Sequence, residues 1–175
     1  MNIPNALTLF RVFLVPVFIL FFFSNIPNSM LWALLVFVLA GSTDMLDGYI
    51  ARKYKLITDW GKVLDPFADK FMLITVLTCL VAKDYIPMWV LLVIVIKELF
   101  MVCFGALLYT RGTIIPSNII GKFSTLCFNL SIVVFIFYEK FGIYLIYISV
   151  VTAVLALLNY SYIYFKNHKG SLKKN

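Results

Sequence analysis

The chain has 175 residues, 63% of them hydrophobic, and a mean hydropathy of +0.99. A soluble domain of this length is far more polar, so the composition indicates an integral membrane protein that forms one domain over residues 1–175. The formal net charge is +7, but in a membrane protein such an excess usually lies at the cytoplasmic face, so it does not indicate a nucleic-acid partner.

Six membrane-spanning helices are expected, because each span needs about 20 mostly apolar residues. The opening MNIPNALTLFR lacks a typical basic start and a small-residue cleavage site. It is therefore expected to be a short interfacial segment before a retained helix, and not a cleaved signal peptide. The sequence predicts an all-α membrane fold with helices over residues 8–24, 30–50, 66–82, 87–109, 119–138 and 142–165, followed by the basic tail 166–175.

The basic residues gather on one side of this arrangement. That side carries Arg11, the loop between the second and third helices, Arg111, Lys122 and the tail. The opposite side carries the uncharged turn SNIPNS and two segments in which a lysine neighbours an acidic residue. The positive-inside rule then places both termini in the cytoplasm. The tail itself is expected to contact anionic lipid headgroups.

Histidine and cysteine restrict the chemistry of the membrane core. The single histidine, His168, lies in the tail, so a proton transfer within the core must use a carboxylate, a lysine, a tyrosine or water. The three cysteines, Cys79, Cys103 and Cys127, each lie in an apolar run without CxxC spacing. They are expected to be small buried hydrophobic residues.

Five of the eight acidic residues lie between positions 42 and 70. Asp44 and Asp47 are three apart, and Asp65 and Asp69 are four apart, so each pair shares one face of its helix. Antiparallel helices bring the two pairs toward each other, and four carboxylates near the hydrocarbon boundary repel and lose hydration. Two divalent cations with a preference for oxygen ligands, such as Mg²⁺ or Mn²⁺, remove this cost. Two-metal sites also serve displacement at phosphorus.

The residues around these aspartates suit a phosphate ligand. Gly48 and Gly61 allow a ligand to approach the backbone, and Ala51 keeps the same face thin. Arg52 lies one turn further and offers a planar fork of donors for phosphate oxygens. Arg52 is also readable as a plain positive-inside charge.

Simpler roles are open for two of the aspartates. Asp65 followed by Pro66 is a typical helix start, with Asp as the N-cap and Pro at the first helical position. Asp59 is expected to be a solvated loop charge.

The pattern Asp44-x-x-Asp47-Gly48-x-x-Ala51-Arg52, followed by Gly61, Asp65 and Asp69, resembles the signature of the CDP-alcohol phosphotransferases at every fixed position and spacing. The opening NIPNALTLFRVFLVPVF also resembles the bacterial phosphatidylglycerophosphate synthases and the related cardiolipin synthases. Together these similarities cover most of the chain and weaken after about residue 125.

The resemblance implies a six-helix enzyme, usually a homodimer, in the plasma membrane with its site open to the cytoplasmic leaflet. It implies transfer of the phosphatidyl group of CDP-diacylglycerol to the hydroxyl of sn-glycerol 3-phosphate, with release of CMP. Asp69 is the general base by this similarity. Two divalent metals are then held by Asp44, Asp47, Asp65 and Asp69, and the CDP part lies against Gly48, Ala51, Arg52 and Gly61.

The acceptor is less closely defined. Glycerol 3-phosphate is an anion, and the candidate cations for its phosphate are Lys97, Arg111 and Lys122. The synthases resemble GKxKT after the fourth helix, where this chain has GKFST, with Ser124 at the second lysine. They also often carry Arg where this chain has Lys97, and this exchange loses a bidentate fork. These departures leave open a cardiolipin synthase that uses phosphatidylglycerol.

Plainer roles and other protein classes stay open as well. Lys122 is readable as a positive-inside charge, and Lys97 as one half of an ion pair with a neighbouring helix. Acidic residues in a membrane also suit a divalent-cation transporter. However, these acids gather at one interface, and no inverted repeat is evident. A non-catalytic membrane scaffold with the same fold is a further alternative, against which the complete aspartate set argues.

Overall fold

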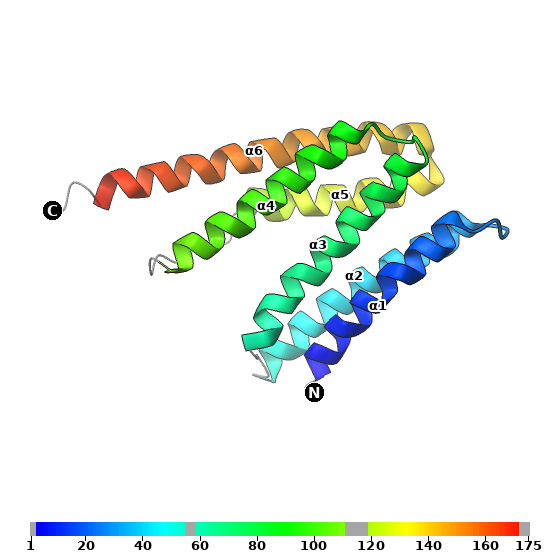
Figure 1. Ribbon diagram of the computed structural model, residues 1–175, viewed down its shortest axis with the longest axis horizontal. Coiled ribbons are helices and arrows are strands. Elements are labelled where there is room, and N and C mark those ends of the chain that lie inside the picture. The colour runs from blue at the N-terminus through cyan, green and yellow to red at the C-terminus, as the bar shows by residue number, and fades with distance from the viewer. Residues whose placement is uncertain (1–2, 55–58, 111–118, 172–175) are drawn as a thin grey trace. The chain divides into compact units, whose positions relative to one another are not determined.

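The computed structural model describes residues 3–54, 59–110 and 119–171, and these ranges hold six α-helices and no strand (Figure 1). Side chains are described for all residues except 1–5, 51–52, 55–66, 69, 103–120, 122 and 160–175. The helices are α1 (Ile3–Phe23), α2 (Ser29–Lys53), α3 (Asp59–Ala82), α4 (Met88–Thr110), α5 (Ile119–Phe137) and α6 (Glu139–Ser171).

The chain divides into two compact units, Met1–Tyr85 and Ile86–Asn175, each with three helices. In the first unit α1 packs against both α2 and α3, so α1 forms the centre of that unit. In the second unit α5 and α4 both pack against α6. The complete aspartate signature belongs to the first unit.

Helices α1 and α2 form an antiparallel hairpin whose facing stripes determine the site. Buried residues recur at spacings of three and four, which keeps them on one face of each helix. At the end near the connecting turn both stripes are apolar, and at the other end both are polar. The α1 stripe contains Thr8, Arg11, Leu14, Val15, Phe18 and Phe22, and the α2 stripe contains Ala33, Phe37, Ala40, Thr43 and Asp47.

The end of α1 is capped by a lysine that follows α3. Lys83 Nζ donates a hydrogen bond to the backbone carbonyl of Phe22 at 2.7 Å and lies 4.6 Å from the centroid of the Phe22 ring. The last carbonyls of a helix have no partner within the helix, and a cation at that end is favoured by the helix dipole. Lys83 therefore attaches the end of α3 to the end of α1.

Lys83→Met is expected to lower the midpoint of thermal unfolding by a few degrees, since the hydrogen bond and the cation–π contact of this exposed side chain together contribute about 1 kcal/mol. The measurement is thermal unfolding of purified protein in detergent by circular dichroism. Lys140→Met, which removes the same charge from an exposed position at the start of α6, is the matched control. Equal shifts in the two variants would contradict the capping role.

Three helices within the described residues are long and apolar enough to cross a membrane: α1 over Ala6–Phe23, α2 over Ser29–Ile50 and α6 over Glu139–Asn159. Shorter apolar stretches occur in α3 over Lys70–Ala82 and in α5 over Phe123–Phe137. The predicted all-α class and the membrane character are thereby confirmed. Cys79 is buried as expected, and Cys127 is partly buried.

The largest differences from the predicted helix starts occur in α1 and α3, which begin at Ile3 and Asp59. Helix α1 is continuous from Ile3, so residues 3–7 belong to the same helix as the predicted span. Helix α3 begins at Asp59, so the expectation of a loop at Asp59 and of an N-cap at Asp65 was wrong. Pro66 lies inside α3, where its ring removes one backbone hydrogen bond in the second or third turn. This local cost does not end the helix.

Candidate active site

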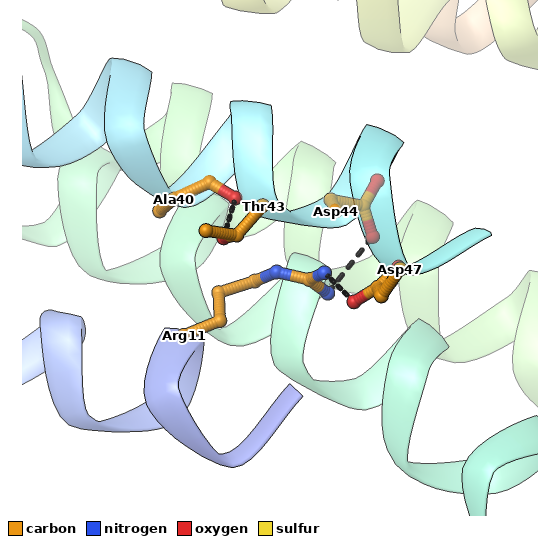
Figure 2. A network of polar contacts seen from close by, with 5 residues as sticks. All are labelled: Arg11, Ala40, Thr43, Asp44 and Asp47. Atoms are coloured by element: carbon orange, nitrogen blue, oxygen red, sulfur yellow. Dashed lines mark hydrogen bonds and ion pairs between the residues drawn. The ribbon is translucent and has the colours of Figure 1, made fainter. Parts of the chain in front are cut away.

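Arg11 of α1 lies between the first two aspartates of the signature (Figure 2). Its Nη1 is 2.8 Å from Asp44 Oδ1, and its Nη2 donates a hydrogen bond to Asp47 Oδ2 at 2.5 Å. The Arg11 side chain is 1% exposed and that of Asp47 is 2% exposed, whereas Asp44 is 40% exposed. One guanidinium thus joins a fully buried carboxylate and a carboxylate at the edge of the unit.

The hairpin explains why these residues meet. Its turn lies between Phe23 and Ser29, so antiparallel packing brings residue 11 opposite residues 44 to 47. The hydroxyl of Thr43 lies beside this cluster but donates to the carbonyl of Ala40 at 2.7 Å, within its own helix (Figure 2). Such a bond to the preceding turn satisfies a buried hydroxyl locally. The Thr43 hydroxyl proton is therefore used within α2 and is not donated to the carboxylates.

The guanidinium offsets the repulsion between Asp44 and Asp47. Arginine keeps its positive charge in proteins and presents its donors as a planar fork, so separate nitrogens can serve separate carboxylates. A charge as buried as that of Asp47 is costly unless it is paired. Within the described part of the chain, the buried carboxylate of Asp47 is paired with the guanidinium of Arg11.

Sequence reasoning treated Arg11 only as a positive charge on the cytoplasmic side and missed this contact. A signal was available, because Arg11 is the one charged side chain before Asp44 and lies within an apolar run. An ionisable residue in such a position needs a partner, usually another charged group inside the bundle. Asp44 and Asp47 were the nearest candidates on the following helix.

The structure brings Asp44 and Asp47 to one face of α2, as their spacing predicted. Gly48 follows directly and is half-buried. Positions 65 and 69 lie four apart along α3, on the face continued by buried Met72 and Val76. The side chains of Asp65, Asp69, Ala51, Arg52 and Lys122, the surroundings of Gly61, and all of Arg111 lie outside the described residues.

The residues present fit a divalent cation. Among the described side chains, no three His, Cys, Asp or Glu residues lie close enough together to hold a metal. The side chains of Asp65 and Asp69, which are expected to complete the set, lie outside the described residues. The described donors are carboxylate oxygens, the ligands preferred by Mg²⁺ and Mn²⁺. They already face a cation, the guanidinium of Arg11.

Two positions that the sequence analysis linked to acceptor binding, Lys97 and Ser124, are described in the second unit. Lys97 Nζ donates to Glu98 Oε1 at 2.6 Å, and both residues are about 95% buried. Lys97 is therefore ion-paired, although with the next residue of α4 and not with a neighbouring helix. Ser124, at the position of the missing lysine, is fully buried, and its hydroxyl has no hydrogen-bond partner within the described part of the chain.

The chain is similar to a known protein family and to several known proteins. Residues 1–155 match the family model for CDP-alcohol phosphatidyltransferases. Two similar relatives are called CDP-diacylglycerol–glycerol-3-phosphate 3-phosphatidyltransferase. The protein from Bacillus subtilis (strain 168) is 35% identical over 136 residues, which cover 71% of this chain and 70% of that protein. The protein from Rickettsia bellii is 39% identical over 135 residues, covering 76% and 75%.

A third relative, a cardiolipin synthase (CMP-forming) from Streptomyces coelicolor, is 35% identical over 134 residues, which cover 74% of this chain and 61% of that protein. The family model covers most of the chain, including all the signature residues. The paired aspartates of α2 lie at the signature's first two acidic positions. The chain belongs to the CDP-alcohol phosphatidyltransferase family of membrane enzymes.

Proposed function

We propose that this enzyme transfers the phosphatidyl group of CDP-diacylglycerol to a hydroxyl of sn-glycerol 3-phosphate, giving phosphatidylglycerophosphate and CMP. The observation that carries the proposal is the complete aspartate signature, whose first pair is gathered on one face of α2 and held by Arg11. The activity named for the relatives from Bacillus subtilis and Rickettsia bellii supports this choice of donor and acceptor.

Asp44, Asp47, Asp65 and Asp69 are proposed to hold two divalent ions, Mg²⁺ or Mn²⁺. The support is their oxygen chemistry and the gathering of the first two carboxylates on one face of α2. When bound, such ions supply positive charge that stabilises phosphate oxygens and the leaving CMP. Gly48, Ala51, Arg52 and Gly61 are proposed to bind the CDP part, with Arg52 donating to phosphate oxygens.

Asp69 is proposed to act as the general base. It takes the proton of the acceptor hydroxyl as that oxygen forms a bond to the phosphorus carrying the lipid. The bond from this phosphorus to the oxygen of CMP breaks, and CMP leaves with the electron pair. An aspartate suits this role because the single histidine lies in the tail. A carboxylate close to cations is a weak base, so most of the rate enhancement comes from positioning and electrostatics.

Lys97, Arg111 and Lys122 are proposed to bind the phosphate of the acceptor. Lys97 shares its charge with Glu98, so it attracts an anion less strongly than a solitary lysine. Arg111 and Lys122 therefore carry the larger share of phosphate binding in this proposal. Their positive charge is what an acceptor that is a small, water-soluble anion requires.

A cardiolipin synthase with phosphatidylglycerol as acceptor is the second candidate. Two observations favour it: Ser124 replaces an expected lysine, and the relative from Streptomyces coelicolor carries that activity in its name. Ser124 is fully buried and removes a positive charge from the segment. A pocket with fewer cations suits a bulkier acceptor that carries its charge as a phosphodiester.

The topology proposed is six membrane spans, with both termini and the site on the cytoplasmic side of the plasma membrane, in a homodimer. The distribution of basic residues supports the orientation. Glycerol 3-phosphate and CMP are water-soluble, which suits a site open to the cytoplasm. The dimer rests on the resemblance to the family.

Asp69→Asn is expected to lower CMP release by about 10²–10⁴-fold, the usual contribution of a general base. The assay uses detergent-purified protein, CDP-diacylglycerol, glycerol 3-phosphate and Mg²⁺. Asp59→Asn removes the same charge from the first residue of the same helix, outside the signature, and is expected to retain activity. Normal CMP release by Asp69→Asn would overturn the assignment of the site.

A further inference from the structure

The proposed reaction gives no role to Arg11, although this residue contacts two of the proposed metal ligands. It is the largest of the fully buried side chains in the described part of the chain, and it binds two proposed metal ligands at once. Its Nε and Nη1 have no hydrogen-bond partner within the described residues, so Nη1 contacts Asp44 as an ion pair only. The guanidinium is therefore held chiefly by Asp44 and Asp47 (Figure 2).

The contact distances place Arg11 in competition with a metal ion. Asp47 Oδ2 lies 2.5 Å from Nη2, and Asp44 Oδ1 lies 2.8 Å from Nη1, so the guanidinium contacts the same carboxylates that are proposed to bind the metal. A permanent positive charge at this distance repels an incoming cation, and the hydrogen bond from Nη2 also occupies a lone pair of Asp47. The same charge also stabilises the two carboxylates when no metal is bound.

We propose that Arg11 is a positioning residue that serves as an internal counter-ion for the metal-free site. It holds Asp44 and Asp47 by its contacts with both carboxylates, and its charge weakens the binding of divalent cations to them. Binding of a metal must therefore displace or share the contacts of Arg11. This inference rests on the metal site of the proposed function.

The test measures Mn²⁺ binding to detergent-purified protein without substrate, together with thermal unfolding with and without Mn²⁺. Arg11→Gln is expected to lower the unfolding midpoint of the metal-free protein. It is also expected to tighten Mn²⁺ binding about tenfold, because removal of a neighbouring like charge favours the cation by about one logarithmic unit. Mn²⁺ should therefore raise the unfolding midpoint of the variant more than that of the wild type.

Two further variants complete the test. Lys140→Gln removes the same charge from an exposed position and is expected to leave Mn²⁺ binding unchanged. Arg11→Lys keeps the charge but loses the fork that reaches both carboxylates. Its affinity for Mn²⁺ is therefore expected to lie between those of the wild type and Arg11→Gln. This variant also decides the question if Arg11→Gln does not fold. Binding by Arg11→Lys no tighter than that of the wild type would then count against the proposal.

The outcomes separate this inference from the proposed function. If Arg11→Gln is less stable but binds Mn²⁺ no more tightly than the wild type, Arg11 is a structural ion pair and the counter-ion proposal is overturned. If neither the wild-type protein nor Arg11→Gln binds Mn²⁺, the proposed metal site fails, and the inference fails with it. Tighter binding in Arg11→Gln, with Lys140→Gln unchanged, supports both.

Discussion

Asp47→Asn is expected to lower the free energy of unfolding by about 3–5 kcal/mol and to abolish CMP release. Asp47 and Arg11 are 2% and 1% exposed, and the variant leaves the guanidinium buried with only Asp44 as a charged partner in the described residues. Removing one member of a buried ion pair has a cost of this size because the other charge cannot recover its hydration. The measurement is denaturant-induced unfolding in detergent micelles, alongside the CMP assay.

Asp44→Asn provides the matched comparison. Asp44 contacts the same guanidinium, but it is 40% exposed, so water replaces much of what the ion pair contributes. The expected loss of stability is about 1 kcal/mol or less. CMP release should nevertheless be lost, because both aspartates are proposed metal ligands. Equal losses of stability in the two variants would contradict the burial argument, and full activity in either would contradict the metal site.

Removal of divalent cations is expected to reduce CMP release to background, and addition of Mg²⁺ or Mn²⁺ should restore it. The proposed site relies on cation charge to stabilise the diphosphate and the departing CMP, and the residues that remain provide a weak base and positioning only. The measurement is CMP release after chelation, after dialysis and after return of each metal, with the metal content of each sample determined.

The fold should survive this treatment. Arg11 stays paired with Asp44 and Asp47 without metal, so the midpoint of thermal unfolding is expected to fall by no more than several degrees. Chelated protein that has lost activity but keeps its helical signal would agree with a catalytic role for the metal. Full turnover in metal-depleted protein would contradict it.

Much of the site was readable from local spacing. The aspartates at 44 and 47 share a face of α2 because positions three apart always do in a helix, whatever surrounds them. The hydrophobic runs likewise placed all six helices, with ends that differ from the structure by a few residues in most cases. Family resemblance added the roles of residues whose spacing alone fits several functions.

The partner of the carboxylates was not predicted, since it depends on a tertiary register. Arg11 meets Asp47 across 36 positions of chain, and this contact depends on how the turn after α1 sets the two stripes against each other. The start of α3 was missed for another reason. Asp65 followed by Pro66 has the chemistry of a helix start, but nothing between Asp59 and Asp65 stops a helix, so α3 begins one or two turns earlier.

Lys97 shows a third limit of sequence reasoning. Neighbouring residues on a helix usually point in different directions, so an ion pair with Glu98 was not anticipated. Burial of both residues changes the balance, because neither charge has water available and the closest opposite charge is one position away. A side-chain conformation that depends on its tertiary surroundings cannot be predicted from the spacing of residues along a helix.

The most direct test of the central claim is CMP release by purified protein from CDP-diacylglycerol and Mg²⁺, with glycerol 3-phosphate in one arm and phosphatidylglycerol in the other. Release is expected with glycerol 3-phosphate alone, with phosphatidylglycerophosphate as the lipid product. Release only with phosphatidylglycerol would contradict the proposed acceptor and assign the enzyme to cardiolipin synthesis. Absence of release in both arms would contradict the proposed function.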